Sequence, residues 1–192
     1  THYRLGRELI WMKNFEDEGS THWNFNSDNE LLQDSIFRRG GIAATQFRNE
    51  DSPDNIITNL ENRMPFNNEF DHTIHGYIKT DNGENVTLEV RLSQGRSGES
   101  LLIASMGDSV QGTKDWLPYW GNVPNHEDAK FFNIRMNTDV PNSGQSQSWF
   151  DDVGLIEWDS LKSFDGFPIS IMHPNNFKYI QVYATETPVV MA

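Results

Sequence analysis

The chain has 192 residues, of which 36% are hydrophobic and 12% aromatic. It can therefore bury the core of one folded domain, and its composition is not that of a disordered chain. Its formal net charge of −13 excludes nucleic acid as a partner, because phosphate binding needs a basic face. The absence of cysteine excludes disulfide bonds and thiolate metal sites, and no apolar run is long enough to predict insertion into a membrane.

Strand signals dominate the chain, as short apolar or alternating runs bounded by glycine, asparagine, aspartate and proline. Convincing helical periodicity is missing, and the pattern allows at most a short helix near 29–36. The predicted strands, in chain order, are 8–13, 41–48, 56–61, 71–80, 85–93, 100–106, 110–120, 129–137, 148–158, 168–172 and 177–184. Strands with this spacing and punctuation predict an all-β fold, a two-sheet antiparallel β-sandwich of the jelly-roll type.

Two of these segments, 72–79 and 86–92, are predicted to pair as a hairpin. Apolar side chains recur at every second position in both, so both apolar sets must point at one core. A three-residue loop that ends at Gly83 pairs Ile78 with Val86 and meets this condition. Glycine suits the left-handed position of such a loop, and we therefore predict this register.

The residues between the apolar positions would form one outward face if these strands and the strand near 129–137 share a sheet. That face would combine aromatic rings, amides and guanidinium groups. Rings stack on the apolar face of a pyranose, and planar amides and guanidinium groups bond its hydroxyls. With a tryptophan at its edge, the predicted ligand-binding residues are His75, Tyr77, Glu89, Arg91, Trp120, Asn133 and Arg135.

Two acidic segments, 14–19 and 148–158, set adjacent carboxylates beside large apolar residues. A carboxylate beside a core strand is costly unless something pairs with it, and a hard cation such as calcium would do so. Strand parity predicts that one of Asp151 and Asp152 lies at the edge of the core. The alternative is a strand end or turn in which backbone amides satisfy the carboxylates.

These acidic segments resemble those that bracket many carbohydrate-binding modules with the galactose-binding-like jelly-roll fold. The resemblance rests on Phe15-Glu16 near one end and on Phe150-Asp151-Asp152-Val153-Gly154-Leu155 near the other. Between them, Thr113-Lys114-Asp115-Trp116-Leu117-Pro118-Tyr119 resembles the Thr-x-x-Trp-x-x-Tyr strand of the family. The resemblance spans residues 5–158, and it specifies the fold better than the ligand, because ligand residues vary among such modules.

The resemblance implies a structural calcium ion, Ca2+, between the two acidic segments. The implied ligands are Glu16, Glu18 and one or both of Asp151 and Asp152, with a backbone carbonyl near Gly41. Backbone oxygens would complete the six to eight oxygen ligands that calcium prefers.

The predicted function is that of a non-catalytic carbohydrate-binding module, secreted or on the cell surface, with a polysaccharide or oligosaccharide as ligand. Residues 1–158 would form the β-sandwich, 159–192 would be a C-terminal extension packed on it, and neighbouring domains of a larger chain would be partners. Two alternatives remain open. A catalytic jelly roll, such as a polysaccharide lyase or glycoside hydrolase, would use a cluster such as His75, Tyr77 and Arg91. A structural or adhesion module would have no glycan site.

Overall fold

The computed structural model of the chain describes residues 2–10, 15, 23–24, 29–33, 42–51, 58–60, 62–105, 108–159, 162–163 and 179–183. Every regular element in these ranges is a strand. The strands are β1 (His2–Glu8), β2 (Trp23–Asn24), β3 (Asn29–Gln33), β4 (Ile42–Asn49), β5 (Thr58–Leu60), β6 (Met64–Pro65), β7 (Asp71–Ser93), β8 (Leu102–Ser105), β9 (Val110–Val123), β10 (Phe131–Asn137), β11 (Gln145–Trp158), β12 (Lys162–Ser163) and β13 (Tyr179–Tyr183). Across these ranges no helix is long and apolar enough to span a membrane.

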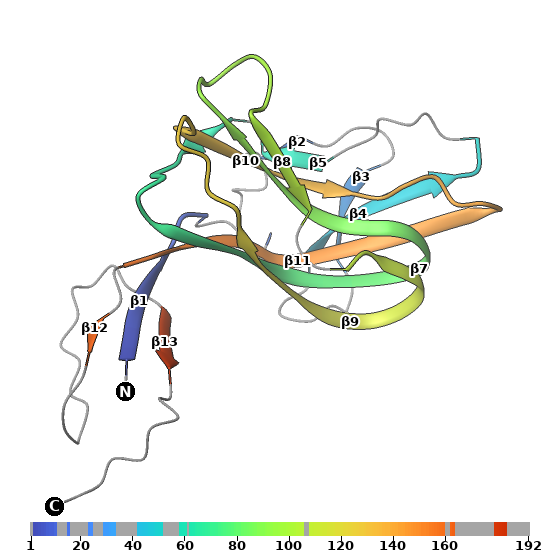
Figure 1. The fold of residues 1–192 in the computed structure, drawn as a ribbon. Helices are drawn as coiled ribbons and strands as arrows, with labels where there is room; N and C mark the ends of the chain where they lie inside the picture. Colours follow the sequence, from blue (N-terminus) through green and yellow to red (C-terminus); the bar gives the residue numbers. More distant parts are fainter. Residues whose placement is uncertain are drawn as a thin grey trace, which may run out of the picture.

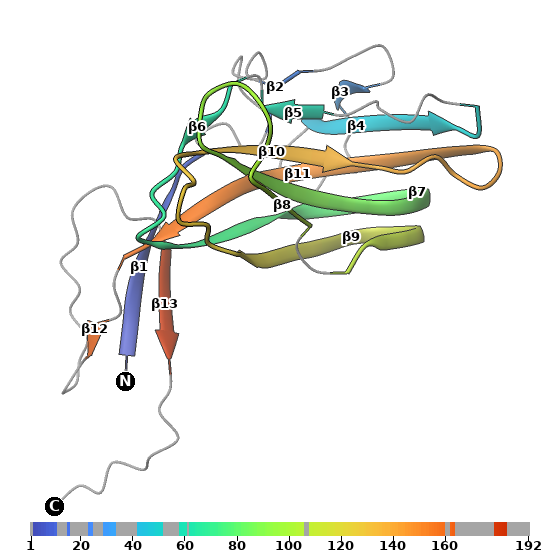
Figure 2. The ribbon, with the colours of Figure 1, turned by 45° about the horizontal axis from the view of Figure 1, so that its top comes forward.

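The strands form two antiparallel layers that face each other across one core (Figures 1 and 2). In the first sheet, β7 pairs with β9 on one side and β11 on the other, and β11 pairs further with β1 and β4. In the second sheet, β10 lies between β7 and β5, and β7 pairs on its far side with β8. The predicted all-β sandwich is confirmed.

The strand β7 belongs to both sheets and runs without interruption for 23 residues. Its first half pairs with β11 and its second half pairs with β10. Between Thr80 and Val86 its register with β9 shifts twice, and Asn82 and Asn85 adopt φ angles of 52° and 45°. Two β-bulges thus turn the strand from one sheet into the other, and the predicted hairpin, with Ile78 opposite Val86, is wrong.

This bent strand directs the alternate apolar side chains at the core, as the predicted hairpin would also have done. Each bulge adds one residue and would turn the following side chains to the other face, but two bulges restore the original alternation. Ile74 and Ile78 before the bend, and Val86 and Leu88 after it, are all fully buried. The chain therefore keeps one apolar side directed at one core through the turn.

The core lies between the two sheets, and the inward side chains of β7, β10 and β11 form its centre. Ile134 and Phe132 on β10 and Leu155 on β11 have no exposed surface. Full burial of a large aliphatic or aromatic side chain stabilises the fold by about 1.5–3 kcal/mol. Because the inner faces are occupied by this core, the polar side chains of the two sheets lie on opposite outer faces.

The segment predicted as a helix near 29–36 begins instead with the strand β3, so that prediction is wrong. Residues Asn29–Gln33 pair antiparallel with β4. A short apolar run does not distinguish a helix from a strand by periodicity, and here the edge of β4 supplies the hydrogen bonds.

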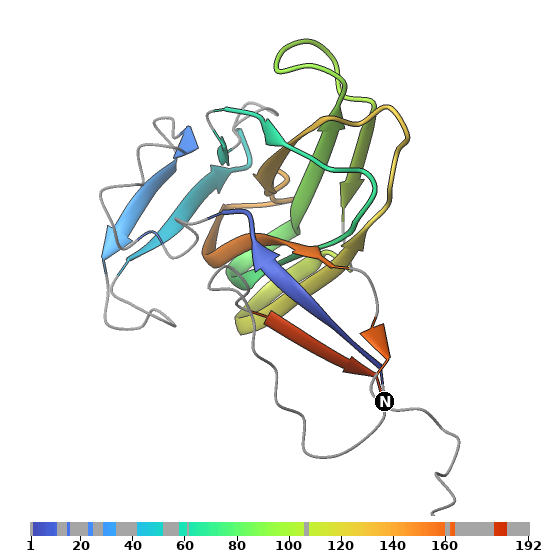
Figure 3. The ribbon, with the colours of Figure 1, turned by 90° about the vertical axis from the view of Figure 1, so that its left-hand side faces the viewer.

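The described parts of the C-terminal segment pair with β1. Both β12 and β13 lie antiparallel to it (Figure 3). The strand predicted at 168–172 lies outside the described residues.

Candidate functional site

The seven predicted ligand-binding residues fall into two groups, because β7 passes from one sheet to the other. Four of them lie on the outer face of the second sheet, which we call the arginine face: Glu89, Arg91, Asn133 and Arg135. Arg91 on β7 is opposite Asn133 on β10, and Glu89 is opposite Arg135. These four residues are brought together as predicted from the alternation, on two neighbouring strands.

On the arginine face, Glu89 lies between two guanidinium groups. Its Oε2 atom is 3.7 Å from Nη2 of Arg91 and 3.8 Å from Nε of Arg135. The exposed fraction of the side chain is 13% for Glu89, 31% for Arg91 and 14% for Arg135. These contacts are ion pairs, and both are too long to be hydrogen bonds.

Several polar atoms on this face are buried without a hydrogen bond to any described residue: Thr87 Oγ1, Glu89 Oε2, Arg91 Nε and Arg135 Nε. A buried polar group without a hydrogen bond costs about 1–3 kcal/mol, and such groups in a native structure call for an explanation. Burial lowers the pKa of Arg135, and the nearby positive charges of Arg91 and Arg48 lower it further. The four buried atoms have almost no accessible surface, whereas the Arg91 side chain is 31% exposed, so Arg91 is the charged side chain of this face that a hydroxyl-rich ligand could reach.

Apolar side chains flank the arginine face. Ile103 on β8 lies opposite Arg91 and is 52% exposed. At one end of β10, the guanidinium carbon of Arg96 lies 5.6 Å from the centroid of the Phe131 ring. The face therefore combines charged hydrogen-bonding groups with an apolar edge, which is how sites for small polar ligands are built.

The other three predicted residues lie on the first sheet. His75 and Tyr77 are on the first half of β7, and Trp120 on β9 lies opposite His75. His75 is buried, with its Nε2 atom 2.7 Å from Oε2 of Glu8, and its ring stacks on Trp120 at a centroid distance of 5.2 Å. Tyr77 is half-buried, and Trp120 is 53% exposed. They therefore lie on a different face from Arg91.

The predicted calcium ligands are described only in part, because Glu16, Glu18 and Gly41 lie outside the described residues. Asp151 and Asp152 are both buried and lie at an irregularity in the pairing of β11 with β7. Asp152 has a φ of 51°, and its backbone N–H donates to Oδ1 of Asp151 at 2.7 Å. Within the described ranges, no three His, Cys, Asp or Glu side chains form a group that could hold a metal ion.

An ionic cluster of Arg7, His72 and Glu157 lies on β1, β7 and β11, away from Asp151 and Asp152 along β11. Nε of Arg7 donates to Oε1 of Glu157 at 2.7 Å, and Oε2 of Glu157 is 3.5 Å from Nε2 of His72. Burial lowers the pKa of His72, although the charge of Glu157 opposes this effect. His72 also stacks on Phe66, so the cluster joins β1, β7 and β11 beside the core.

Glu8 was not predicted from the sequence as part of any site. It pairs with His75 across the intervening strand β11, at a separation of 67 residues along the chain. The only signal was a single carboxylate at the start of a predicted strand, and nothing in the sequence indicated its partner.

No protein-family model and no curated protein matches the chain, so the similarities are to solved structures. The CBM22-1 xylan-binding domain of Paenibacillus barcinonensis Xyn10C is 12% identical, with a TM-score of 0.55 over 80% of this chain and 92% of that one. The Clostridium thermocellum xylanase 10B CBM22-1–GH10 modules, complexed with xylohexaose, are 13% identical, with a TM-score of 0.56 over 79% of this chain. That match covers 29% of the xylanase chain.

An arabinose-bound enzyme has a similar structure in part. The MgGH51 α-L-arabinofuranosidase is 17% identical, with a TM-score of 0.57 over 80% of this chain. The chain spans 27% of the arabinofuranosidase. At these identities the similarity shows the fold alone, and the chain therefore has a β-sandwich fold that it shares with the CBM22-1 xylan-binding domain.

Proposed function

We propose that this protein is a carbohydrate-binding module that holds an oligosaccharide or a segment of polysaccharide on the arginine face. The observation that carries the proposal is the placement of one carboxylate and two guanidinium groups side by side on this outer face, where the Arg91 side chain is 31% exposed and lies opposite the exposed Ile103. Sugar hydroxyls both donate and accept hydrogen bonds, so one ligand can satisfy the carboxylate and the guanidinium groups together. The exposed side chain of Ile103 would then pack against the apolar face of a sugar ring.

We propose that binding is not followed by catalysis. Glycoside hydrolysis uses two carboxylates on either side of the scissile bond, whereas Glu89 on this face is held between two arginines. The cluster that a lyase would need is divided, since His75 and Tyr77 lie on the first sheet and Arg91 lies on the second. An unsaturated product that absorbs in the ultraviolet, formed from a bound polysaccharide, would contradict this part of the proposal.

The proposal also includes a structural calcium ion, held by one or both of Asp151 and Asp152 together with Glu16, Glu18 and a carbonyl near Gly41. It is supported by the burial of both aspartates on a strand beside the core. Carboxylate and carbonyl oxygens are the ligands that calcium prefers. The proposal places the module outside the cell, secreted or on the cell surface. It would there be one domain of a larger protein.

The test of glycan binding is a glycan array with and without chelator, followed by calorimetry on the glycans that bind. Arg91→Ala should weaken binding roughly tenfold or more, because a hydrogen bond to a charged group contributes about 1.5–3 kcal/mol. Lys130→Ala removes an exposed positive charge away from the arginine face and is the matched control. An array without any bound glycan, or equal affinities for the two variants, would show that the arginine face is not the site.

A further inference from the structure

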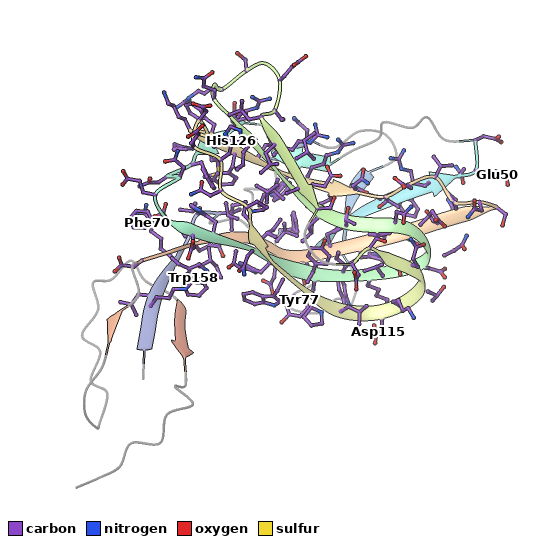
Figure 4. The ribbon with its side chains drawn as sticks, viewed as in Figure 1. Glu50, Phe70, Tyr77, Asp115, His126 and Trp158 are labelled. Atoms are coloured by element: carbon purple, nitrogen blue, oxygen red, sulfur yellow. The ribbon has the colours of Figure 1, made fainter. Side chains whose placement is uncertain are left out.

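We propose that the outer face of the first sheet is a second glycan-binding surface, for an uncharged oligosaccharide, so that one domain holds two glycan chains on opposite sides. This inference rests on the proposed function, since it assigns a second site for the same class of ligand. We call this surface the tryptophan face, and its residues are His75, Tyr77, Lys79, Trp120 and Trp149. Figure 4 shows Tyr77 and Asp115 along the same side of the sheet.

The indole ring of Trp120 is held in place by buried groups although it is half exposed. One side of the ring lies on the imidazole of His75, with 26° between the planes. The Nε2 atom of His75 is 2.7 Å from Oε2 of Glu8. The other carboxylate oxygen, Oε1, accepts hydrogen bonds from the backbone N–H groups of Leu155 at 2.8 Å and Ile10 at 3.2 Å.

The Glu8–His75 pair requires a glycine in the strand between them. A Cβ atom at Gly154 of β11 would lie 2.5 Å from Nε2 of His75 and 2.6 Å from Oε2 of Glu8. Without a side chain at this position, Glu8 on β1 reaches across β11 to β7. The exposed fractions of the His75 and Glu8 side chains are 6% and 3%, so a buried hydrogen-bonded pair supports an exposed ring. A ring fixed in this way loses little conformational entropy when a sugar stacks on it.

The tryptophan face is hollowed near the bend of β7. A cavity of about 370 Å³ opens there, lined by Trp149, by Lys79 and Lys114, and by Asp81 and Asp115. Nζ of Lys79 lies 5.9 Å from the centroid of the Trp149 ring and 3.4 Å from Oδ1 of Asp115. An aromatic wall with a few convergent polar groups is typical of small-ligand sites.

The cavity and Trp120 lie on one side of the sheet and can contact one extended ligand. Trp149 is paired in register with Lys79, and Trp120 with His75, so these side chains share a face. His75 and Lys79 are four residues apart, which is roughly 13 Å along a strand.

The charge of this surface favours an uncharged ligand. The positive charges of the two lysines around the cavity cancel the negative charges of the two aspartates, although the chain as a whole carries a net charge of −13. A strongly charged ligand or partner would therefore gain little here. The rings of Trp120 and Trp149 are paired with strand positions four residues apart, and Tyr77 and Lys79 on β7 place hydrogen-bonding groups beside them. Separated rings with hydrogen-bonding groups between them suit a chain of pyranose units.

The test is calorimetric titration with xylohexaose and with β-1,4-galactotriose, on the wild-type protein and on Trp120→Ala, Arg91→Ala and the double variant. We expect two bound oligosaccharides per domain in the wild type, one in each single variant and none in the double variant. Leu117→Ala is the matched control, because Leu117 is 41% exposed on the same strand but is paired with the inward-facing Ile78. Trp120→Ala should lower the melting temperature by only a few degrees, because Trp120 is already 53% exposed in the folded protein.

A second measurement follows the six tryptophan indole N–H signals by NMR in the Arg91→Ala variant, with Trp120→Phe used to assign the signal of Trp120. The Trp120 signal should shift when xylohexaose or galactotriose is added. One bound oligosaccharide, unaffected by Trp120→Ala, would overturn the second site and leave the proposed function intact. No binding of either sugar to any variant, with an array that is also blank, would overturn both. A stable dimer that Trp120→Ala dissociates would assign this face to a second copy instead.

Discussion

At the scale of single residues, the functional candidates depend on groups that are themselves buried. Glu8 and His75 orient an exposed ring, and Glu89 holds two guanidinium groups on the other side of the molecule. Buried polar groups that are paired with one another are costly to disturb, so each set of contacts fixes the geometry of its face.

Gly154→Ala tests how closely the first of these pairs is packed. The added methyl group would overlap both Glu8 and His75 and should lower the free energy of unfolding by about 1–3 kcal/mol, as overpacking does in a closely packed site. Urea unfolding followed by circular dichroism measures this change. Gly95→Ala is the control, because the nearest atom to its Cβ would be 3.4 Å away. Equal stability of the two variants would show that the pair can move aside at little cost.

At the scale of elements, the bend of β7 decides which residues meet. Asn82 has a φ of 52° at the bend, and its amide donates to the backbone oxygens of Ser143 and Gln145 at 3.2 Å and 3.1 Å. Asparagine tolerates this left-handed conformation better than most residues, and its side chain ties the bend to the loop before β11.

Asn82→Ala should therefore destabilise the fold by about 1–3 kcal/mol, since it loses both the tolerance of positive φ and the side-chain bonds. Asn82→Gly loses the bonds but tolerates the conformation, so its cost should be smaller. Thermal and urea unfolding of the two variants measure the difference. A glycine variant that is less stable than the alanine variant would contradict this account of the bend.

The sequence predicted the strands β4, β9, β10 and β11, their inward positions and the four residues of the arginine face, because all of these follow from alternation along a strand. The first strand, predicted at 8–13, is instead β1 at His2–Glu8. Ile134 and Arg135, for example, are adjacent and face opposite sides, as the pattern requires. Alternation does not distinguish a hairpin from a strand with two bulges, and the path of β7 was therefore mispredicted. The pairing of Glu8 with His75 depends on tertiary structure and leaves no periodic signal.

At the scale of the whole molecule, the proposed calcium ion would join two segments that are remote in sequence. An ion that binds only the folded state stabilises it by mass action, by about 2.7 kcal/mol at a hundred times its Kd. EDTA should therefore lower the melting temperature by roughly 5–10 °C, and added calcium should restore it.

The double variant Asp151→Asn with Asp152→Asn should not respond to EDTA or calcium, whatever its own stability. Lack of a chelator effect on a wild-type sample shown by elemental analysis to contain calcium would contradict a structural role for the ion. The measurement is differential scanning calorimetry on samples at equal protein concentration.

The two sheets also share a continuous covalent and hydrogen-bonded element, since β7 pairs with β11 along its first half and with β10 along its second. Neither sheet can open along this strand without disturbing the other. Amide hydrogens along β7 should then exchange with solvent only when the entire domain unfolds, as one cooperative unit. Mechanical tension applied across the domain would accordingly be resisted by both layers at once, so one layer would not peel away from the other.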